Sequence, residues 1–301
     1  MDATPGRLPL VIAAVTSGLV ATARCNTRTP SNAPLRAPEG LTITVRGRGP
    51  DVVLIHGALG DYRQWEAIGD VLSSRYRVIA VSRRFHWPNP APTAPVLYSF
   101  EKQSEDLNEL LDSLHRPVHL VGHSYGAGVA LLTGLHHPEL VRSLTLIEPP
   151  FGSVVPLSSP GFAAELASRD SMVAALRVQV QAGSVDRAAE GLIDWVEGES
   201  GGFRRLPQAT QDELLANAAT AGPTYAVPAP RVTCEQLQSL RLPVLVLRGE
   251  QTRPWYRLIA EATANCIEGA ETAVIPAARH MTIVENPSGT ASLVLTFIGR
   301  H

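Results

Sequence analysis

Short apolar runs and helix-like segments alternate along the chain from residue 41 onward. Runs in which nearly every position is apolar or β-branched are typical of strands covered on both faces, and they occupy residues 51–55, 76–81, 118–121 and 144–147. Segments with apolar residues at helical spacing lie between them, at 62–74, 100–114 and 127–135. Residues 41–45 instead alternate apolar and polar positions, as a half-buried edge strand does. This order predicts a mostly parallel, doubly wound α/β sheet with helices on both faces.

The alternation stops after residue 150 and resumes at residue 242. The stretch between contains helical patterns at 162–180, 185–196 and 208–219 and no clear strand pattern. Strand-like runs return at 243–247 and 272–275, and a final helix is expected after Asn286-Pro287. Open α/β sheets bind ligands at the carboxyl ends of their strands. We therefore expect residues 151–241 to form a helical lid over that edge, and residues 40–150 and 242–301 to form the core.

The first 24 residues follow a different pattern. Arg7 precedes an apolar run at 8–20, which is short for a bilayer span, and small residues follow it. This arrangement is typical of a signal peptide, and residues 25–39, rich in Asn, Thr, Pro and Ser, are typical of a linker. We expect an exported protein, periplasmic or secreted, if the signal functions, and a cytoplasmic protein otherwise.

Composition narrows the choice of partner. The chain has 301 residues, of which 45% are hydrophobic and 18% charged, with a net charge of −2. It contains no run of Lys and Arg that would favour nucleic acid, and no stretch that predicts a stable membrane span. The expected partner is a small-molecule substrate, and no pattern indicates an oligomeric state.

Cysteine and histidine spacings predict no metal site, because the chain has neither a CxxC nor an HExxH motif. Three cysteines do not make a disulfide framework. Cys234 and Cys266 could pair in an oxidising compartment, but we favour two unpaired, buried thiols.

The clearest candidate for chemistry is Gly122-His123-Ser124-Tyr125-Gly126, between the strand at 118–121 and the following helix. A nucleophilic serine needs an exposed hydroxyl on a sharp strand-to-helix turn, and glycines such as Gly122 and Gly126 relieve the crowding there. Ser124 is therefore the candidate nucleophile. The alternative is an ordinary surface turn that happens to contain serine.

A second motif, His56-Gly57-Ala58-Leu59, follows the strand at 51–55. Its position suits an oxyanion hole built from the backbone N–H groups of Ala58 and Tyr125. His56 and Leu59 are candidates for lining the substrate space.

The general base should be a histidine on a late loop. His280 follows the strand at 272–275 and completes the chain order serine, acid, histidine. The alternative is a solvated loop histidine.

Together, residues 54–65, the Ser124 turn, the strand end at 147–150 and the His280 loop resemble the α/β-hydrolase superfamily, over residues ~40–300. Within it, the chain is similar to lid-bearing serine esterase-like members whose sixth strand ends in Glu-Pro-Pro. The segment 203–220 is similar to lids of that group. The resemblance implies hydrolysis of an ester, lactone, thioester or amide without a cofactor, although some members cleave carbon–carbon bonds or act as cofactor-free haloperoxidases.

The sequence departs from this superfamily at the acid. Members commonly place it three residues after the glycine that ends the strand at 244–248, where this chain has Thr252. Threonine cannot carry the charge that stabilises an imidazolium. Glu148, at the end of the preceding core strand, is the leading candidate for the acid because some members carry it there, and Glu250 is the alternative.

The second departure is the segment 82–89, which replaces a small, glycine-rich turn. Arg84, His86 and Trp87 could line the substrate entrance or bind a carboxylate; equally, Arg83 and Arg84 could be solvated. In the expected lid region, Phe151 and Trp195 are candidates for an apolar acyl pocket, although apolar helix faces more often serve packing.

These observations favour a carboxylesterase-like serine hydrolase that cleaves a small-molecule carboxylic ester, lactone or thioester through an acyl-enzyme intermediate. The alternative is a carbon–carbon bond hydrolase or a haloperoxidase-like enzyme on the same scaffold. A non-catalytic ligand receptor is a third hypothesis.

Overall fold

The structure, a computed structural model, describes Met1 and residues 37–91 and 98–301. The predicted signal peptide, apart from Met1, and most of the predicted linker lie outside the described residues. All the elements below belong to one compact unit, Leu35–His301.

A seven-stranded sheet forms the centre of this unit, with the strand order β1-β3-β2-β4-β5-β6-β7. β1 pairs with β3 in the antiparallel sense, and every other pair is parallel, which confirms the predicted mostly parallel sheet. The strands are β1 (Thr42–Arg46), β2 (Asp51–Ile55), β3 (Arg77–Ser82), β4 (Val118–His123), β5 (Val141–Ile147), β6 (Val244–Gly249) and β7 (Glu271–Ile275).

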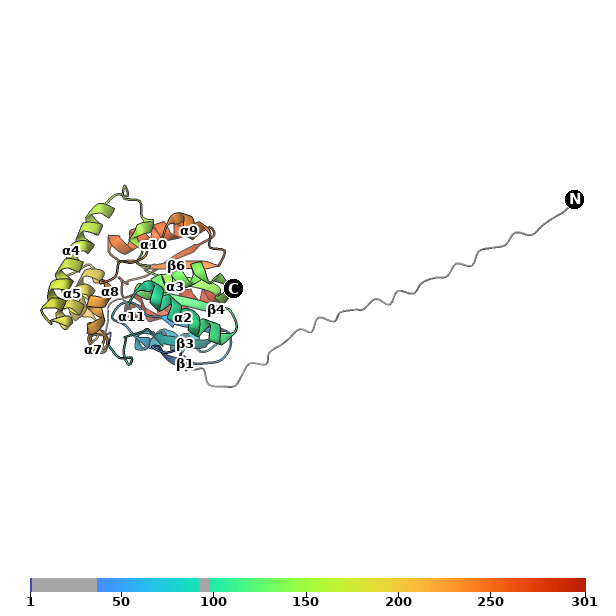
Figure 1. The fold of residues 1–301 in the computed structure, drawn as a ribbon, viewed down its shortest axis with the longest axis horizontal. Helices are drawn as coiled ribbons and strands as arrows, with labels where there is room; N and C mark the ends of the chain where they lie inside the picture. Colours follow the sequence, from blue (N-terminus) through green and yellow to red (C-terminus); the bar gives the residue numbers. More distant parts are fainter. Residues whose placement is uncertain (2–36, 92–97) are drawn as a thin grey trace. The chain divides into compact units, whose positions relative to one another are not determined.

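Helices cover both faces of the sheet, because side chains alternate between the two faces of each strand. Val53 and Ile55 of β2 belong to the core cluster that contains α2 and α3, whereas Val52 and Leu54 belong to the cluster that contains α1 and α12. Figure 1 shows α2 and α3 lying over one face. The helices of the two layers are α1 (Glu66–Leu72), α2 (Phe100–Leu114), α3 (Tyr125–His136), α10 (Pro254–Cys266), α11 (Thr282–Glu285) and α12 (Pro287–Ile298), with short 3-10 turns η1 (Tyr62–Trp65) and η3 (Pro138–Leu140).

The final helix shows how local sequence sets a helix boundary. The Asn286 side chain accepts a hydrogen bond from the Gly289 N–H at 2.9 Å, and Pro287 occupies the first helical position. An asparagine cap supplies a partner for a free N–H of the first turn, and proline needs no N–H partner there. The helix expected after Asn286-Pro287 is therefore present.

The residues between β5 and β6 form helices joined by turns and irregular segments, with no strand. Figure 1 shows α4, α5, α7 and α8 packed together beside the sheet, away from α2 and α3. Their bounds are η4 (Gly152–Val154), α4 (Phe162–Gln181), α5 (Val185–Glu197), α6 (Gly202–Arg205), α7 (Gln208–Ala216), η5 (Ala218–Thr220), α8 (Ala221–Thr224) and α9 (Cys234–Gln238). We call residues 151–241 the helical block. The hydrophobic pattern did not single out α6, α8 and α9, which are at most five residues long.

A disulfide joins Cys234 of α9 to Cys266, the last residue of α10. This corrects the expectation of two unpaired thiols. The two cysteines are 32 residues apart in sequence, and only the packing of α9 against α10 brings them together. Closing a loop of this length lowers the entropy of the unfolded chain and stabilises the fold by roughly 3–4 kcal/mol.

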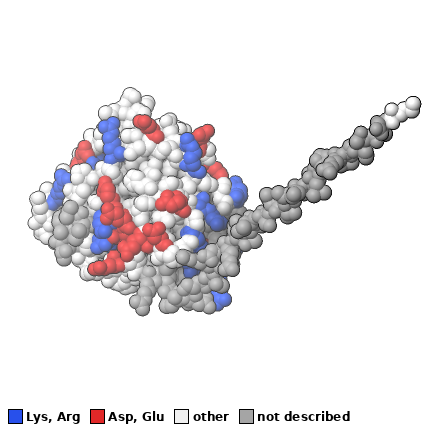
Figure 2. All heavy atoms as spheres, turned by 45° about the vertical axis from the view of Figure 1, so that its right-hand side comes forward, with Lys and Arg blue, Asp and Glu red and all other residues white. Residues whose placement is uncertain are grey.

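The surface carries charges of both signs. On the face in Figure 2, acidic side chains form one dense group, and Lys and Arg side chains are spread around it. Among the described residues of this face, the two signs are mixed and the basic side chains form no continuous area (Figure 2). None of the helices in the described part of the chain is long and apolar enough to span a membrane.

Candidate active site

Strand register brings the candidate residues to one edge of the sheet. Ile55 lies opposite Gly122, and Ile147 lies opposite both His123 and Leu247. The carboxyl ends of β2, β4, β5 and β6 are thus neighbours. The loops that follow these strands begin with His56, Ser124, Glu148 and Glu250, so residues far apart in sequence meet here.

Ser124 occupies the sharp turn between β4 and α3. Its backbone has φ 52° and ψ −118°, a conformation that costs a residue with a side chain about 1–3 kcal/mol. Hydrogen bonds hold it there: the Ser124 N–H donates to the Ile147 carbonyl at 2.8 Å, and the Ser124 carbonyl accepts from the Ala127 N–H at 2.9 Å. The surrounding fold therefore maintains a strained turn that presents the hydroxyl.

The two glycines of this turn are required by close backbone contacts. A Cβ on Gly122 would overlap the Gly126 carbonyl oxygen and the Ala127 backbone. A Cβ on Gly126 would overlap the carbonyl oxygens of Ile55 and His56. Only glycine fits at both positions, as the sequence pattern indicated.

Three side chains form a continuous hydrogen-bonded chain at this edge. His280 Nε2 lies 2.9 Å from Ser124 Oγ, and His280 Nδ1 lies 3.0 Å from Glu148 Oε2. Ser124 is 8% exposed, whereas His280 and Glu148 are almost fully buried. The structure thus brings together the residues that the sequence suggested as nucleophile, base and acid.

Glu148 is held by two further donors. The Gly249 N–H donates to Glu148 Oε1 at 2.7 Å, and the Thr252 hydroxyl donates to Glu148 Oε2 at 2.7 Å. The sequence pattern indicated only that Thr252 cannot serve as the acid, and it did not predict this hydrogen bond. Glu250, the alternative acid, instead accepts a hydrogen bond from the Ala277 N–H at 2.9 Å and makes no hydrogen bond to His280.

Burial shifts both ionisable members of this chain. It lowers the pKa of His280 to about 3, so the imidazole is neutral near pH 7 and can accept a proton. Burial raises the pKa of Glu148 to about 8, against the hydrogen bonds from Thr252 and Gly249, which lower it. The Thr252 hydroxyl therefore favours the ionised carboxylate.

The loop after β2 lies against the serine turn. A Cβ on Gly57 would lie 3.1 Å from the Ser124 Cβ and 3.0 Å from His123 Nδ1, so a larger residue here would crowd the serine turn. Ala58 and Tyr125 border the same cavity as Ser124. Tyr125 is the first residue of α3, and N–H groups of a first helical turn have no partner within the helix.

A buried arginine and a neutral histidine hold this loop. Arg83, 2% exposed, donates from Nη2 to the Gly57 carbonyl at 2.9 Å and from Nε to the His56 carbonyl at 3.1 Å. The Arg83 N–H donates to His56 Nε2 at 3.0 Å, so the His56 proton is on Nδ1, which donates to the Gly57 carbonyl at 2.8 Å. Burial lowers the pKa of His56 well below its usual value, with a smaller contribution from the Arg83 charge.

These contacts decide between the alternatives that the sequence left open for the two arginines. Arg83 is buried rather than solvated. Arg84 makes a two-bond ion pair with Asp106, from Nε at 2.6 Å and Nη2 at 2.7 Å, so its guanidinium is already paired.

Four residues expected to line the substrate space do not border the cavity next to Ser124. His56, Leu59 and His86 are fully buried, and His86 Nε2 is hydrogen-bonded to the Tyr98 hydroxyl at 2.7 Å. Trp87 is 39% exposed, but its ring lies under the Arg63 guanidinium, 4.0 Å from the ring centroid. The sequence placed these residues in the right loops, but the packing directs their side chains elsewhere.

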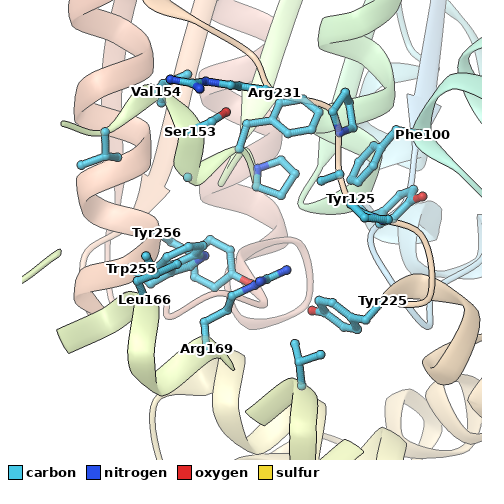
Figure 3. Close-up of a pocket in the computed structure, with 18 of the residues that line it drawn as sticks. Phe100, Tyr125, Ser153, Val154, Leu166, Arg169, Tyr225, Arg231, Trp255 and Tyr256 are labelled. Atoms are coloured by element: carbon cyan, nitrogen blue, oxygen red, sulfur yellow. The ribbon is translucent and has the colours of Figure 1, made fainter. Parts of the chain in front are cut away.

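Ser124 borders a cavity of about 830 Å³. Figure 3 shows aromatic side chains around it, from the first residues of α2 and α3, from α10 and from the helical block. Phe151 and Trp195, both suggested by the sequence, border it, and so do Trp255 and Tyr256 of α10, which the sequence pattern did not identify.

The loop that carries His280 is anchored to the helical block. Glu197, the last residue of α5, accepts a hydrogen bond from the Met281 N–H at 3.0 Å and forms an ion pair with Arg205. Arg205 also pairs with Glu285 at 2.8 Å. The position of the base therefore depends on the helical block as well as on the sheet.

The family follows from this fold and from a direct match. The family model described as Alpha/beta hydrolase family matches residues 52–293, most of the chain. The chain belongs to this family.

Several similar proteins are hydrolases by name. The uncharacterized hydrolase YraK of Bacillus subtilis is 31% identical over 123 residues, which are 40% of this chain and 45% of that protein. The 2-(acetamidomethylene)succinate hydrolase of Mesorhizobium japonicum is 25% identical over 268 residues, 86% of this chain and 91% of that protein. A hydrolase from Pseudomonas aeruginosa has a similar crystal structure, with a TM-score of 0.69, 25% identity and coverage of 90% of this chain and 100% of that one.

Proposed function

We propose that this chain is a carboxylesterase-like serine hydrolase that cleaves a small-molecule carboxylic ester, lactone or thioester through an acyl-enzyme intermediate. The observation that carries the proposal is the hydrogen-bonded chain from Ser124 through His280 to Glu148 beside a cavity of about 830 Å³. A nucleophile, a base in contact with it and a group that orients the base are the requirements of nucleophilic acyl transfer.

In the first half of the reaction, Ser124 Oγ attacks the acyl carbon and its proton passes to His280 Nε2. The ionised Glu148 accepts the Nδ1–H of His280, which fixes the tautomer and stabilises the imidazolium. The N–H groups of Ala58 and Tyr125 donate to the oxygen of the tetrahedral intermediate. Each such donor lowers the barrier by about 3 kcal/mol. His280 then protonates the leaving alcohol or thiol, and the acyl-enzyme remains.

In the second half, water replaces the leaving group. His280 takes a proton from the water, whose oxygen attacks the acyl carbon, and then returns that proton to Ser124 Oγ. The carboxylic acid leaves. The protons pass only among Ser124, His280, water and the leaving group, so the reaction needs no cofactor.

Arg83 and His56 have a supporting role in this scheme. Both donate to the Gly57 carbonyl, which belongs to the same peptide group as the Ala58 N–H. Donors to a carbonyl polarise its peptide group and strengthen the N–H as a donor. The helical block, in turn, would act as a lid, since Trp195 and other residues of it line the same cavity as Ser124.

Labelling with a fluorophosphonate, followed by turnover of p-nitrophenyl esters, tests the proposal. We expect the wild type to be labelled and active, and Ser124→Ala to lose both properties. Ser153→Ala is the matched control, because Ser153 borders the same cavity but its hydroxyl is bonded to the Val232 carbonyl. Equal labelling of Ser124→Ala and wild type would contradict the proposal. Turnover of β-diketones without turnover of esters would assign carbon–carbon bond hydrolysis instead.

We also propose that the protein works outside the cytoplasm. The disulfide between Cys234 and Cys266 supports this, because such bonds persist in oxidising compartments. Fractionation of cells that express the full chain tests it. Recovery of the protein only from the cytoplasm, with both thiols free, would contradict export.

A further inference from the structure

The charged residues that border the cavity are all of one sign. Among the described residues of its wall, three are arginines, namely Arg169, Arg177 and Arg231, and none is Asp, Glu or Lys. A cavity with cationic side chains and low-dielectric walls attracts anions. The remaining wall is mostly apolar or aromatic, so the positive charge is not balanced within the cavity.

Arg169 is the arginine placed to contact a bound molecule. Figure 3 shows its side chain extending from α4 into the space between Tyr225 and the pair Trp255–Tyr256. Its guanidinium carbon lies 5.8 Å from the centre of the Tyr225 ring. Arg177 and Arg231 are exposed. Their charges can attract an anion towards the cavity, but they are less suited to bind it there.

The donors of Arg169 are only partly used. Nη1 donates to Asp170 at 3.0 Å, but the Asp170 side chain is 61% exposed, and water weakens such surface pairs. Nε and Nη2 make no hydrogen bond to any described residue. A planar guanidinium with two free donors fits a carboxylate well.

Two tyrosines add neutral donors to the same space. Burial raises the pKa of Tyr225 to about 12 and raises that of Tyr256 well above its ordinary value, so both hydroxyls keep their protons. Figure 3 shows the Tyr225 hydroxyl pointing into the cavity, towards Arg169. A phenol hydroxyl donates readily to an anionic oxygen.

Tyr256 connects this group to the reacting atoms. Its ring stacks on the His280 ring, with the centroids 3.9 Å apart. A molecule held by Arg169 and Tyr256 therefore lies in the cavity that Ser124 borders, and one of its two partners packs directly on the base.

We propose that Arg169, Tyr225 and Tyr256 bind a carboxylate of the substrate, so that the enzyme hydrolyses esters of dicarboxylic acids that keep one acid free. The inference rests on the proposed function, because the same cavity must hold the scissile ester next to Ser124. The aromatic wall formed by Trp195 and Trp255 accommodates an apolar or aromatic alcohol portion.

A matched pair of substrates tests the proposal. Monobenzyl glutarate carries a carboxylate, and benzyl hexanoate replaces it with an ethyl group; benzyl alcohol release reports both. We expect the wild type to favour the acidic ester about tenfold or more in kcat/KM, as a charge-assisted hydrogen bond of ~1.5–3 kcal/mol would give. Arg169→Met should remove this preference, because kcat/KM should fall more for monobenzyl glutarate than for benzyl hexanoate.

Further variants distinguish loss of carboxylate recognition from a general loss of activity. Arg204→Met is the matched control, since Arg204 belongs to the helical block but pairs with Glu190 outside the cavity; its preference should equal that of the wild type. Arg169→Lys should retain part of the preference, because it keeps the charge but loses the planar pair of donors. Tyr256→Phe keeps the ring that stacks on His280 and should weaken the preference for the acidic ester.

The outcomes distinguish this inference from the proposed function. Equal kcat/KM for the two esters in the wild type would overturn the carboxylate site and leave the serine hydrolase standing. Preference for benzyl 4-phosphonobutanoate over monobenzyl glutarate would also overturn it, in favour of a phosphonate-type anion. Binding of monobenzyl glutarate to Ser124→Ala, measured by calorimetry, needs no turnover; binding that is unchanged when Arg169→Met is added would contradict the inference even if no ester is hydrolysed.

Discussion

The Thr252 hydroxyl donates a hydrogen bond of 2.7 Å to Glu148 Oε2, the same oxygen that faces His280. Thr252 stands where many α/β-hydrolases carry the acid itself. In this chain the carboxylate comes from the end of β5, and the usual acid position supplies a donor to it. Position 148 therefore supplies the carboxylate, and position 252 supplies a hydrogen-bond donor to it.

The identity of the acid can be tested directly. Glu148→Gln keeps the size of the side chain but removes the charge that stabilises protonated His280, so kcat should fall by roughly 10³–10⁴-fold. Glu250→Gln should keep activity within about twofold, because Glu250 is bonded to the Ala277 N–H and not to His280. Steady-state kinetics on one ester suffices. The reverse result would transfer the acid role to Glu250.

Thr252 should set the pH dependence of the rate. The proposed reaction needs ionised Glu148, whose pKa is raised to about 8, so kcat/KM should rise with pH through the neutral range and level off above it. Thr252→Val removes a donor that lowers this pKa, so the rising limb should move to higher pH, whereas Thr252→Ser should restore it. The limb reports the coupled Glu148–His280 pair. An unchanged profile for Thr252→Val would contradict this role.

Arg83 should affect the rate more than substrate binding. Arg83→Met removes the Nη2 donor from the Gly57 carbonyl, which weakens and displaces the Ala58 N–H. We expect kcat to fall roughly 10–100-fold with little change in KM, since the oxyanion forms only in the transition state. Arg83→Lys should recover part of the loss. A rise in KM with unchanged kcat, measured on a properly folded variant by circular dichroism, would contradict this interpretation.

Buried histidines should make the fold sensitive to acid. Burial lowers the pKa of His119 to about 4 and those of His123 and His280 to about 3, below the usual 6.5. Between these values the unfolded chain binds more protons than the folded one. The contribution of these neutral histidines to the stability of the fold is therefore present above pH 6.5 and is lost as the pH falls towards 3–4.

Buried glutamates act in the opposite sense at higher pH. Burial raises the pKa of Glu148 to about 8 and that of Glu197 to about 7, so their contribution is present below pH 4.5 and is lost as the pH rises through 7–8. Stability should therefore be greatest at about pH 6–7. Urea denaturation across pH 4–9 measures it, and His119→Asn, outside the candidate site, should flatten the acidic side. A stability that keeps rising down to pH 4 would contradict this prediction.

The sequence determined the fold and most of the candidate site. Apolar runs and helical spacing are local properties, and they predicted the order of strands and helices because burial of those side chains is what drives the elements together. The sharp turn at Ser124 could be predicted because a turn of this shape requires glycine, which lacks a Cβ, at positions 122 and 126. His280 could be predicted as the base because it completes the order serine, acid, histidine along the chain.

Tertiary structure decided what depends on distant contacts. Glu148 rather than Glu250 meets His280 because β5 ends opposite Leu247 of β6, so that Gly249 and Thr252 can donate to its carboxylate. The pairing of Cys234 with Cys266 and the placement of Arg169 in the cavity likewise depend on how helices pack. A local pattern of apolar residues determines which face of a helix or strand is buried. Which distant residue that face contacts is determined only by the packing of the whole core.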